Sequence, residues 1–181
     1  MAKTLWLLRH AHARENPPAG GRDRDRRLSA RGQFEASALG EELKSSERTL
    51  PTLVVVSPAA RTKETCARVF GDLGGKGEVV VDQDLYRATP DDVVDMVRRF
   101  PDDVAIAGVV GHNPTIHCLS LDLLAEVLFE QSHPGSSHYP PGTISVLSFP
   151  ISTWGQLGWG EATLEWFRVP QKEERTAEKF L

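Results

Sequence analysis

The stretch Thr4-Leu5-Trp6-Leu7-Leu8-Arg9-His10-Ala11 decides the fold. Its apolar run over residues 4–8 predicts a strand that is buried on both faces, as the strands of a parallel sheet are. An arginine and a histidine follow at the point where this strand ends. In open α/β sheets, ligands bind just outside the carboxyl ends of the strands. The stretch therefore predicts the centre of a sheet and, directly after it, a place where functional residues would lie.

The rest of the chain alternates short apolar runs with helical patterns. This alternation is typical of an α/β fold, and we expect a three-layer α/β/α sandwich around a mostly parallel sheet. Further strands are predicted over residues 53–56, 79–81, 104–110, 144–149 and 163–167. Helices are predicted to begin at residues that commonly cap or open a helix, namely Ser29, Ser57, Thr89 and Asn113-Pro114.

The length and composition are those of one ordinary globular domain. The chain has 181 residues, of which 40% are hydrophobic and 25% are charged, and these values are usual for a single domain. We expect that domain over residues 1–170 and a charged tail over residues 171–181. The net charge of −4 argues against a nucleic-acid-binding surface over the whole protein. No apolar run resembles a signal peptide or a membrane span, so we expect a cytoplasmic protein without a membrane partner.

Three polar clusters follow predicted strands along the chain. Arg9-His10 follows the first strand, residues 57–61 follow the second, and Gly111-His112-Asn113 follows the fourth. Because the carboxyl ends of parallel strands meet at one edge of a sheet, we expect the clusters to share one pocket. Arginine side chains and the N–H groups at helix starts both bind anions well. An imidazole among them can act as a nucleophile toward phosphorus.

These clusters resemble the motifs of a known family. Leu8-Arg9-His10-Ala11 resembles the RHG signature of the histidine phosphatase (phosphoglycerate mutase-like) superfamily, and residues 57–65 resemble its SxxxRxxxT element. Val110-Gly111-His112-Asn113-Pro114 is similar to its second histidine motif. Asp25-Arg26-Arg27-Leu28-Ser29 and Asp84-Leu85-Tyr86 resemble secondary motifs of the branch that contains the SixA-type phosphohistidine phosphatases. The resemblance covers most of the chain and implies a phosphoglycerate mutase-like fold.

The resemblance also implies a reaction and a role for each main site residue. His10 would attack phosphorus and carry the phosphoryl group as a covalent phosphohistidine, which water would then hydrolyse. His112 would be the second catalytic histidine, and we expect it to be cationic. Arg9 and Arg61 would bind the phosphoryl oxygens, where negative charge develops. Because these groups supply positive charge, we expect neither a metal ion nor another cofactor.

The chain departs from the family pattern at two points. Ala11 stands where the signature usually has glycine, and no glutamate stands where larger phosphomonoesterase members place their general acid. Asp84 is the nearest candidate for that acid. Arg26 and Asn16 are further candidates for binding phosphate, although both also suit a solvated loop.

The weak candidate for an acid bears on the substrate. The leaving group of a phosphohistidine is an imidazole, which departs more easily than an alkoxide. We therefore expect the partner to be a protein phosphohistidine or a small phosphorylated compound. Two alternatives stay open at this point: a phosphomutase acting on a small phosphate ester, and a weakly catalytic phosphate-binding regulatory module. The short chain leaves few residues for a lid over the pocket, which favours a phosphatase over a mutase.

Overall fold

One six-stranded sheet forms the centre of the computed structural model, which describes residues 2–71, 73–75, 77–125 and 138–171. The strands lie in the order β3-β2-β4-β1-β5-β6. Their bounds are β1 (Lys3–Arg9), β2 (Leu53–Val56), β3 (Glu78–Val81), β4 (Ile106–Gly111), β5 (Ile144–Phe149) and β6 (Thr163–Arg168). β3, β2, β4 and β1 pair in parallel, whereas β5 runs antiparallel to both of its neighbours. The prediction of a mostly parallel sheet is therefore confirmed. Of the predicted tail, only Gln171 belongs to the described residues.

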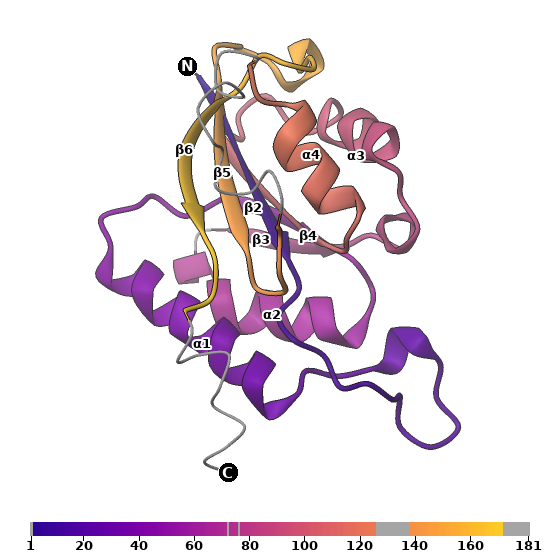
Figure 1. Ribbon diagram of the computed structural model, residues 1–181. Helices are drawn as coiled ribbons and strands as arrows, with labels where there is room; N and C mark the ends of the chain where they lie inside the picture. The colour runs from indigo at the N-terminus through magenta and orange to yellow at the C-terminus, as the bar shows by residue number, and fades with distance from the viewer. Residues whose placement is uncertain (1, 72, 76, 126–137, 172–181) are drawn as a thin grey trace.

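Two pairs of helices cover the sheet. Helices α1 (Ala30–Ser45) and α2 (Ala60–Phe70) lie on one face, and α3 (Pro90–Val97) and α4 (Thr115–Asp122) lie on the other (Figure 1). This arrangement is the predicted three-layer sandwich. Short 3-10 turns lie between the larger elements, and two of them border the functional site described below: η1 (Asp23–Asp25) and η3 (Asp84–Tyr86).

The strand β1 separates two hydrophobic cores. Leu5 and Leu7 belong to the core beneath α3 and α4, whereas Trp6 and Leu8 belong to the core beneath α1 and α2. All four side chains are at most 2% exposed. Because both faces of this strand are covered by helices, it needs no polar alternation. The apolar run of residues 4–8 thus has the burial that its sequence predicted.

Three of the four predicted helix starts are confirmed and one is wrong. Helix α4 begins at Thr115, directly after Asn113-Pro114. Ser29 caps α1, with its Oγ accepting a hydrogen bond from the Gly32 amide at 3.1 Å. Thr89 caps α3 in the same way. Ser57 does not cap α2, which begins at Ala60 without a side-chain cap. The Ser57 hydroxyl lies instead against a histidine of the next cluster, and this contact replaces the capping bond.

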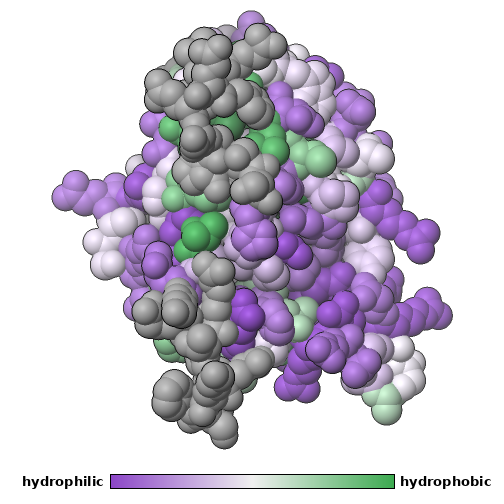
Figure 2. Space-filling model, viewed as in Figure 1, coloured by the Kyte–Doolittle hydropathy of each residue, from purple (hydrophilic) through white to green (hydrophobic). Residues whose placement is uncertain are grey.

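No helix among the described residues is both long enough and apolar enough to cross a membrane. The face seen in Figure 2 is mainly hydrophilic wherever the structure describes it.

Candidate active site

Backbone hydrogen bonds bring the three polar clusters to one edge of the sheet. Arg9 is paired with Gly111 in the register of β1 and β4, and the His10 amide donates to the Gly111 carbonyl at 3.1 Å. The Ser57 amide donates to the Val110 carbonyl at 3.0 Å. The segments that follow β1, β2 and β4 are therefore tied together at the carboxyl ends of these parallel strands. Their side chains form the candidate active site.

His10 lies in this site with one ring nitrogen fixed by the backbone. Its Nδ1 is 2.8 Å from the Ala11 carbonyl oxygen. Because a carbonyl only accepts, Nδ1 carries the proton, and Nε2 of the neutral ring keeps its lone pair. Burial lowers the pKa of His10 to about 3, although the bond to Ala11 acts in the opposite direction. The charges of His112, Arg61 and Arg9 lower this pKa further. The ring is therefore neutral at pH 7, which is the state a nucleophile needs.

His112 lies beside His10, with the two ring centroids 5.2 Å apart. Its Nε2 is 2.8 Å from Oγ of Ser57, and its buried Nδ1 has no hydrogen-bond partner among the described residues. Burial, and then the charge of Arg61, lower the pKa of His112 to about 4, against a raising effect of Asp23. His112 is thus neutral at pH 7 in the ligand-free site, which differs from the expected cation. The reason is its half-buried position next to arginines. A bound phosphoryl group would bring negative charge and favour protonation.

Two arginines supply positive charge to the site. Arg61 is only 7% exposed, and its guanidinium donates to the Asp23 carbonyl at 2.9 Å and to the Asp23 carboxylate at 3.0 Å. Arg9 donates through Nη1 to the Tyr139 carbonyl at 2.7 Å. Its buried Nε has no partner within the described part of the chain. Burial lowers the pKa of Arg9, but a guanidinium stays charged in proteins.

Asp23 joins Arg61 to the ring of Tyr86. The Tyr86 hydroxyl donates to Asp23 Oδ2 at 2.6 Å, and Arg26 donates to Oδ1 at 3.0 Å. The bonds from Tyr86, Arg26 and Arg61 hold the pKa of Asp23 well below its usual range, so this carboxylate is not a proton donor. The Tyr86 ring lies edge-on to the ring of His112, at 5.4 Å between centroids. Asp23 and Tyr86 therefore shape the wall of the site.

The segment after His10 is clamped by α1 and α2. The Ala11 amide donates to Oγ1 of Thr65 at 3.0 Å, and the His12 amide donates to the buried carboxylate of Glu35 at 2.9 Å. A Cβ atom at Gly32 would lie 1.9 Å from the His12 carbonyl oxygen. Only glycine permits this close approach of helix and loop. The clamp fixes the backbone whose Ala11 carbonyl orients His10.

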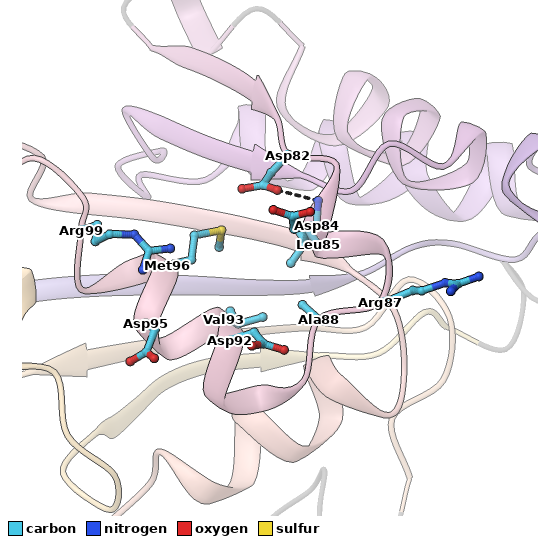
Figure 3. A pocket seen from close by; sticks show the side chains of 10 residues that line it. All are labelled: Asp82, Asp84, Leu85, Arg87, Ala88, Asp92, Val93, Asp95, Met96 and Arg99. Carbon is cyan, nitrogen blue, oxygen red and sulfur yellow. Dashed lines mark hydrogen bonds between the residues drawn. The ribbon is translucent and has the colours of Figure 1, made fainter.

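The other predicted site residues lie farther out. Asp84 lines a hollow of about 380 Å³ together with Asp82, Asp92 and Asp95 (Figure 3). No contact between Asp84 and either histidine is found among the described residues, so its role as an acid stays a prediction. Arg26 reaches the site only through Asp23, and its Nε donates to the Arg14 carbonyl. The exposed Asn16 makes no side-chain hydrogen bond to the described residues.

Three contributors to the site, Tyr86, Ser57 and Asp23, are not evident from the sequence. Tyr86 belongs to the motif Asp84-Leu85-Tyr86, but its contact with His112 depends on how η3 packs. Ser57 has the local sequence of a helix cap, which conceals its contact with His112. Asp23 lies in a loop that alternates arginine with aspartate, and only the arginine content of that loop indicates an anion site nearby.

The chain is similar to known proteins in both sequence and structure. Residues 5–86 match the family described as "Histidine phosphatase superfamily (branch 1)". An uncharacterized protein of Mycobacterium leprae (strain TN) is 32% identical over 165 residues, which cover 88% of this chain and 99% of that protein.

Two solved structures are similar over nearly their whole length. One is a candidate phosphohistidine phosphatase SixA from Nakamurella multipartitia, with a TM-score of 0.76 and 32% identity, covering 94% of this chain and 97% of that one. The other is a candidate phosphohistidine phosphatase SixA from Agrobacterium tumefaciens, with a TM-score of 0.75 and 28% identity, covering 94% of this chain and 99% of that one.

Proposed function

Because this chain belongs to the histidine phosphatase superfamily (branch 1), we propose that it is a metal-independent phosphatase that forms a covalent phosphohistidine on His10. One observation carries the proposal. The Ala11 carbonyl holds the proton of His10 on Nδ1, and burial keeps the ring neutral. The lone pair of Nε2 is therefore available for attack on phosphorus.

The reaction has two displacements. In the first, Nε2 of His10 attacks phosphorus, a P–N bond forms, and the bond between phosphorus and the leaving group breaks. The leaving group departs with the electron pair and takes up a proton from bulk water. In the second, a water molecule attacks phosphorus, passes one proton to bulk water and displaces the His10 nitrogen as the P–N bond breaks, which releases inorganic phosphate and restores neutral His10. Arg9 and Arg61 stabilise the negative charge on the phosphoryl oxygens in both steps.

The surroundings of the two histidines support a substrate with a good leaving group. Asp23 is held ionised by its hydrogen bonds, and Asp84 lines a hollow beside the site. Neither carboxyl is therefore well placed to protonate an alkoxide. An imidazole leaving group departs more easily than an alkoxide and therefore depends less on protonation by a general acid. We accordingly propose a protein phosphohistidine or a small phosphorylated compound as the substrate, in keeping with the SixA-type neighbours.

A panel of phosphoryl donors tests this function. Phosphate release is measured from a phosphohistidine peptide and from several phosphate monoesters, with the wild type and with His10→Ala. We expect release of inorganic phosphate by the wild type and a loss of at least about a thousandfold in His10→Ala. His12→Asn is the matched control, because this histidine is two residues away and its Nδ1 contacts Ser29. Residual activity of His10→Ala within tenfold of the wild type, or isomerised esters in place of free phosphate, would contradict the proposal.

A further inference from the structure

A second hollow, of about 470 Å³, lies beside the candidate active site. The loop around η1 forms one wall and η3 forms the other. The hydrogen bond from the Tyr86 hydroxyl to Asp23 ties these two walls together. The hollow is lined by Arg22, Asp23, Arg24, Gln83, Asp84, Tyr86 and Arg87.

Tyr86 connects this hollow to the phosphoryl site. One edge of its ring faces His112, and its hydroxyl reaches the carboxylate that holds Arg61. Tyr86 and Arg87 also line a smaller cavity, of about 180 Å³, together with His112 and Asn113. Tyr86 and Arg87 therefore line both the hollow and the smaller cavity next to His112.

The hollow has an excess of positive charge. Arg22, Arg24 and Arg87 form no ion pair with any described residue. The carboxylate of Asp23 is already engaged by Arg26, Arg61 and Tyr86, which leaves Asp84 as the one lining acid without such partners among the described residues. Figure 3 shows the Arg87 side chain extending away from the acidic side chains of the neighbouring hollow. Three unpaired guanidinium groups at one place in a chain of net charge −4 favour an anionic ligand.

We propose that this hollow is a subsite for a second anionic group, a phosphate or a carboxylate, carried by the leaving group of the substrate. The inference rests on the proposed phosphatase function and narrows it to substrates with two separate anionic groups. Such a group has two possible sources: a small bisphosphorylated compound, or an acidic residue beside a phosphohistidine in a protein.

Two matched pairs of substrates test the subsite. One pair is 1,4-phenylene bisphosphate and phenyl phosphate, whose phenoxide leaving groups need less protonation than an alkoxide. The other is a phosphohistidine peptide with aspartates on both sides of the histidine and the same peptide with asparagines. In at least one pair we expect the wild type to prefer the member with the second anionic group by about fivefold in kcat/KM, mainly through KM. Because surface charges are screened, this preference should shrink at high salt. The pair that shows it identifies the source.

The test variant is the double substitution Arg24→Gln and Arg87→Gln. It should bring the ratio of kcat/KM within the preferred pair close to one. The control is Arg48→Gln with Arg68→Gln, which removes the same charge from positions over Trp166 and beside Ser37. This control should keep the preference. A wild type without a preference in either pair, or a test variant that retains the preference, would overturn the subsite.

Binding to the His10→Ala variant separates the two proposals. The affinity of this variant for the same four compounds reports binding at the subsite without hydrolysis. In the preferred pair, the member with the second anionic group should bind about fivefold more tightly than the other member. Equal affinities within both pairs would overturn the subsite and leave the phosphatase function standing. Absence of phosphate release from all four compounds with the wild type would instead contradict the phosphatase function, while the binding preference would still decide the subsite.

Discussion

The hydroxyl of Ser57 contacts His112. Removing this hydroxyl should lower the free energy of unfolding by a measurable amount. Ser57 is fully buried, and its Oγ lies 2.8 Å from Nε2 of His112. Nδ1 of the same ring already lacks a partner among the described residues. Ser57→Ala therefore leaves the half-buried ring without either bond. Loss of a buried hydrogen bond with one polar partner left behind costs about 1–3 kcal/mol. A decrease of about 2 kcal/mol in the free energy of unfolding should lower the melting temperature by about 4–8 °C for a chain of this size.

A double-mutant cycle measures the contact itself. The free energy of unfolding is determined by urea denaturation for the wild type, Ser57→Ala, His112→Ala and the double variant. We expect a coupling energy of about 1 kcal/mol, because the two groups contact each other directly. Ser120→Ala is the matched control: its hydroxyl is equally buried but donates to the His117 carbonyl, so it should not couple to His112. A coupling energy below about 0.3 kcal/mol for Ser57 and His112 would refute this reasoning.

Three further predictions follow from the geometry. Because burial lowers the pKa of His112 to about 4, below the 6.5 of an ordinary histidine, the unfolded chain binds more protons between these values. The free energy of unfolding should therefore rise with pH across that window, less steeply in His112→Asn, and equal slopes in urea titrations would contradict this. Asp23→Asn should lower kcat/KM about tenfold, because the Arg61 guanidinium loses the carboxylate that holds it. Asp23→Glu should recover part of this loss. An unchanged kcat/KM in Asp23→Asn would contradict the role of Asp23 in positioning Arg61. Gly32→Ala should destabilise the protein by about 2–4 kcal/mol, because its Cβ would lie 1.9 Å from the His12 carbonyl oxygen; thermal unfolding at the wild-type temperature would contradict it.

The sequence predicted those features that depend on local patterns. The apolar run of residues 4–8 indicates a strand covered on both faces, and the polar clusters after β1, β2 and β4 reach one edge because parallel strands end there. Ser29 and Thr89 cap helices because their capping geometry involves only the next turn. These features need no knowledge of contacts between distant segments.

The features that were missed depend on distant contacts. Asp23 and Tyr86 are 63 residues apart in sequence, and nothing local to either indicates their hydrogen bond. Ser57 has the local sequence of a helix cap, but its hydroxyl lies against His112, which is 55 residues away. The neutral state of His112 follows from burial beside Arg61, and burial is a property of the assembled site.

The most direct test of the central proposal is to trap the phosphorylated enzyme. The wild type is mixed briefly with a labelled phosphohistidine peptide, quenched in alkali and digested, and the label is located by mass spectrometry. We predict an alkali-stable, acid-labile phosphoryl group on the peptide that contains His10, present in His12→Asn and absent from His10→Ala. A label on another residue, or phosphate release by the wild type with no phosphorylated enzyme at any quench time, would contradict the covalent role of His10.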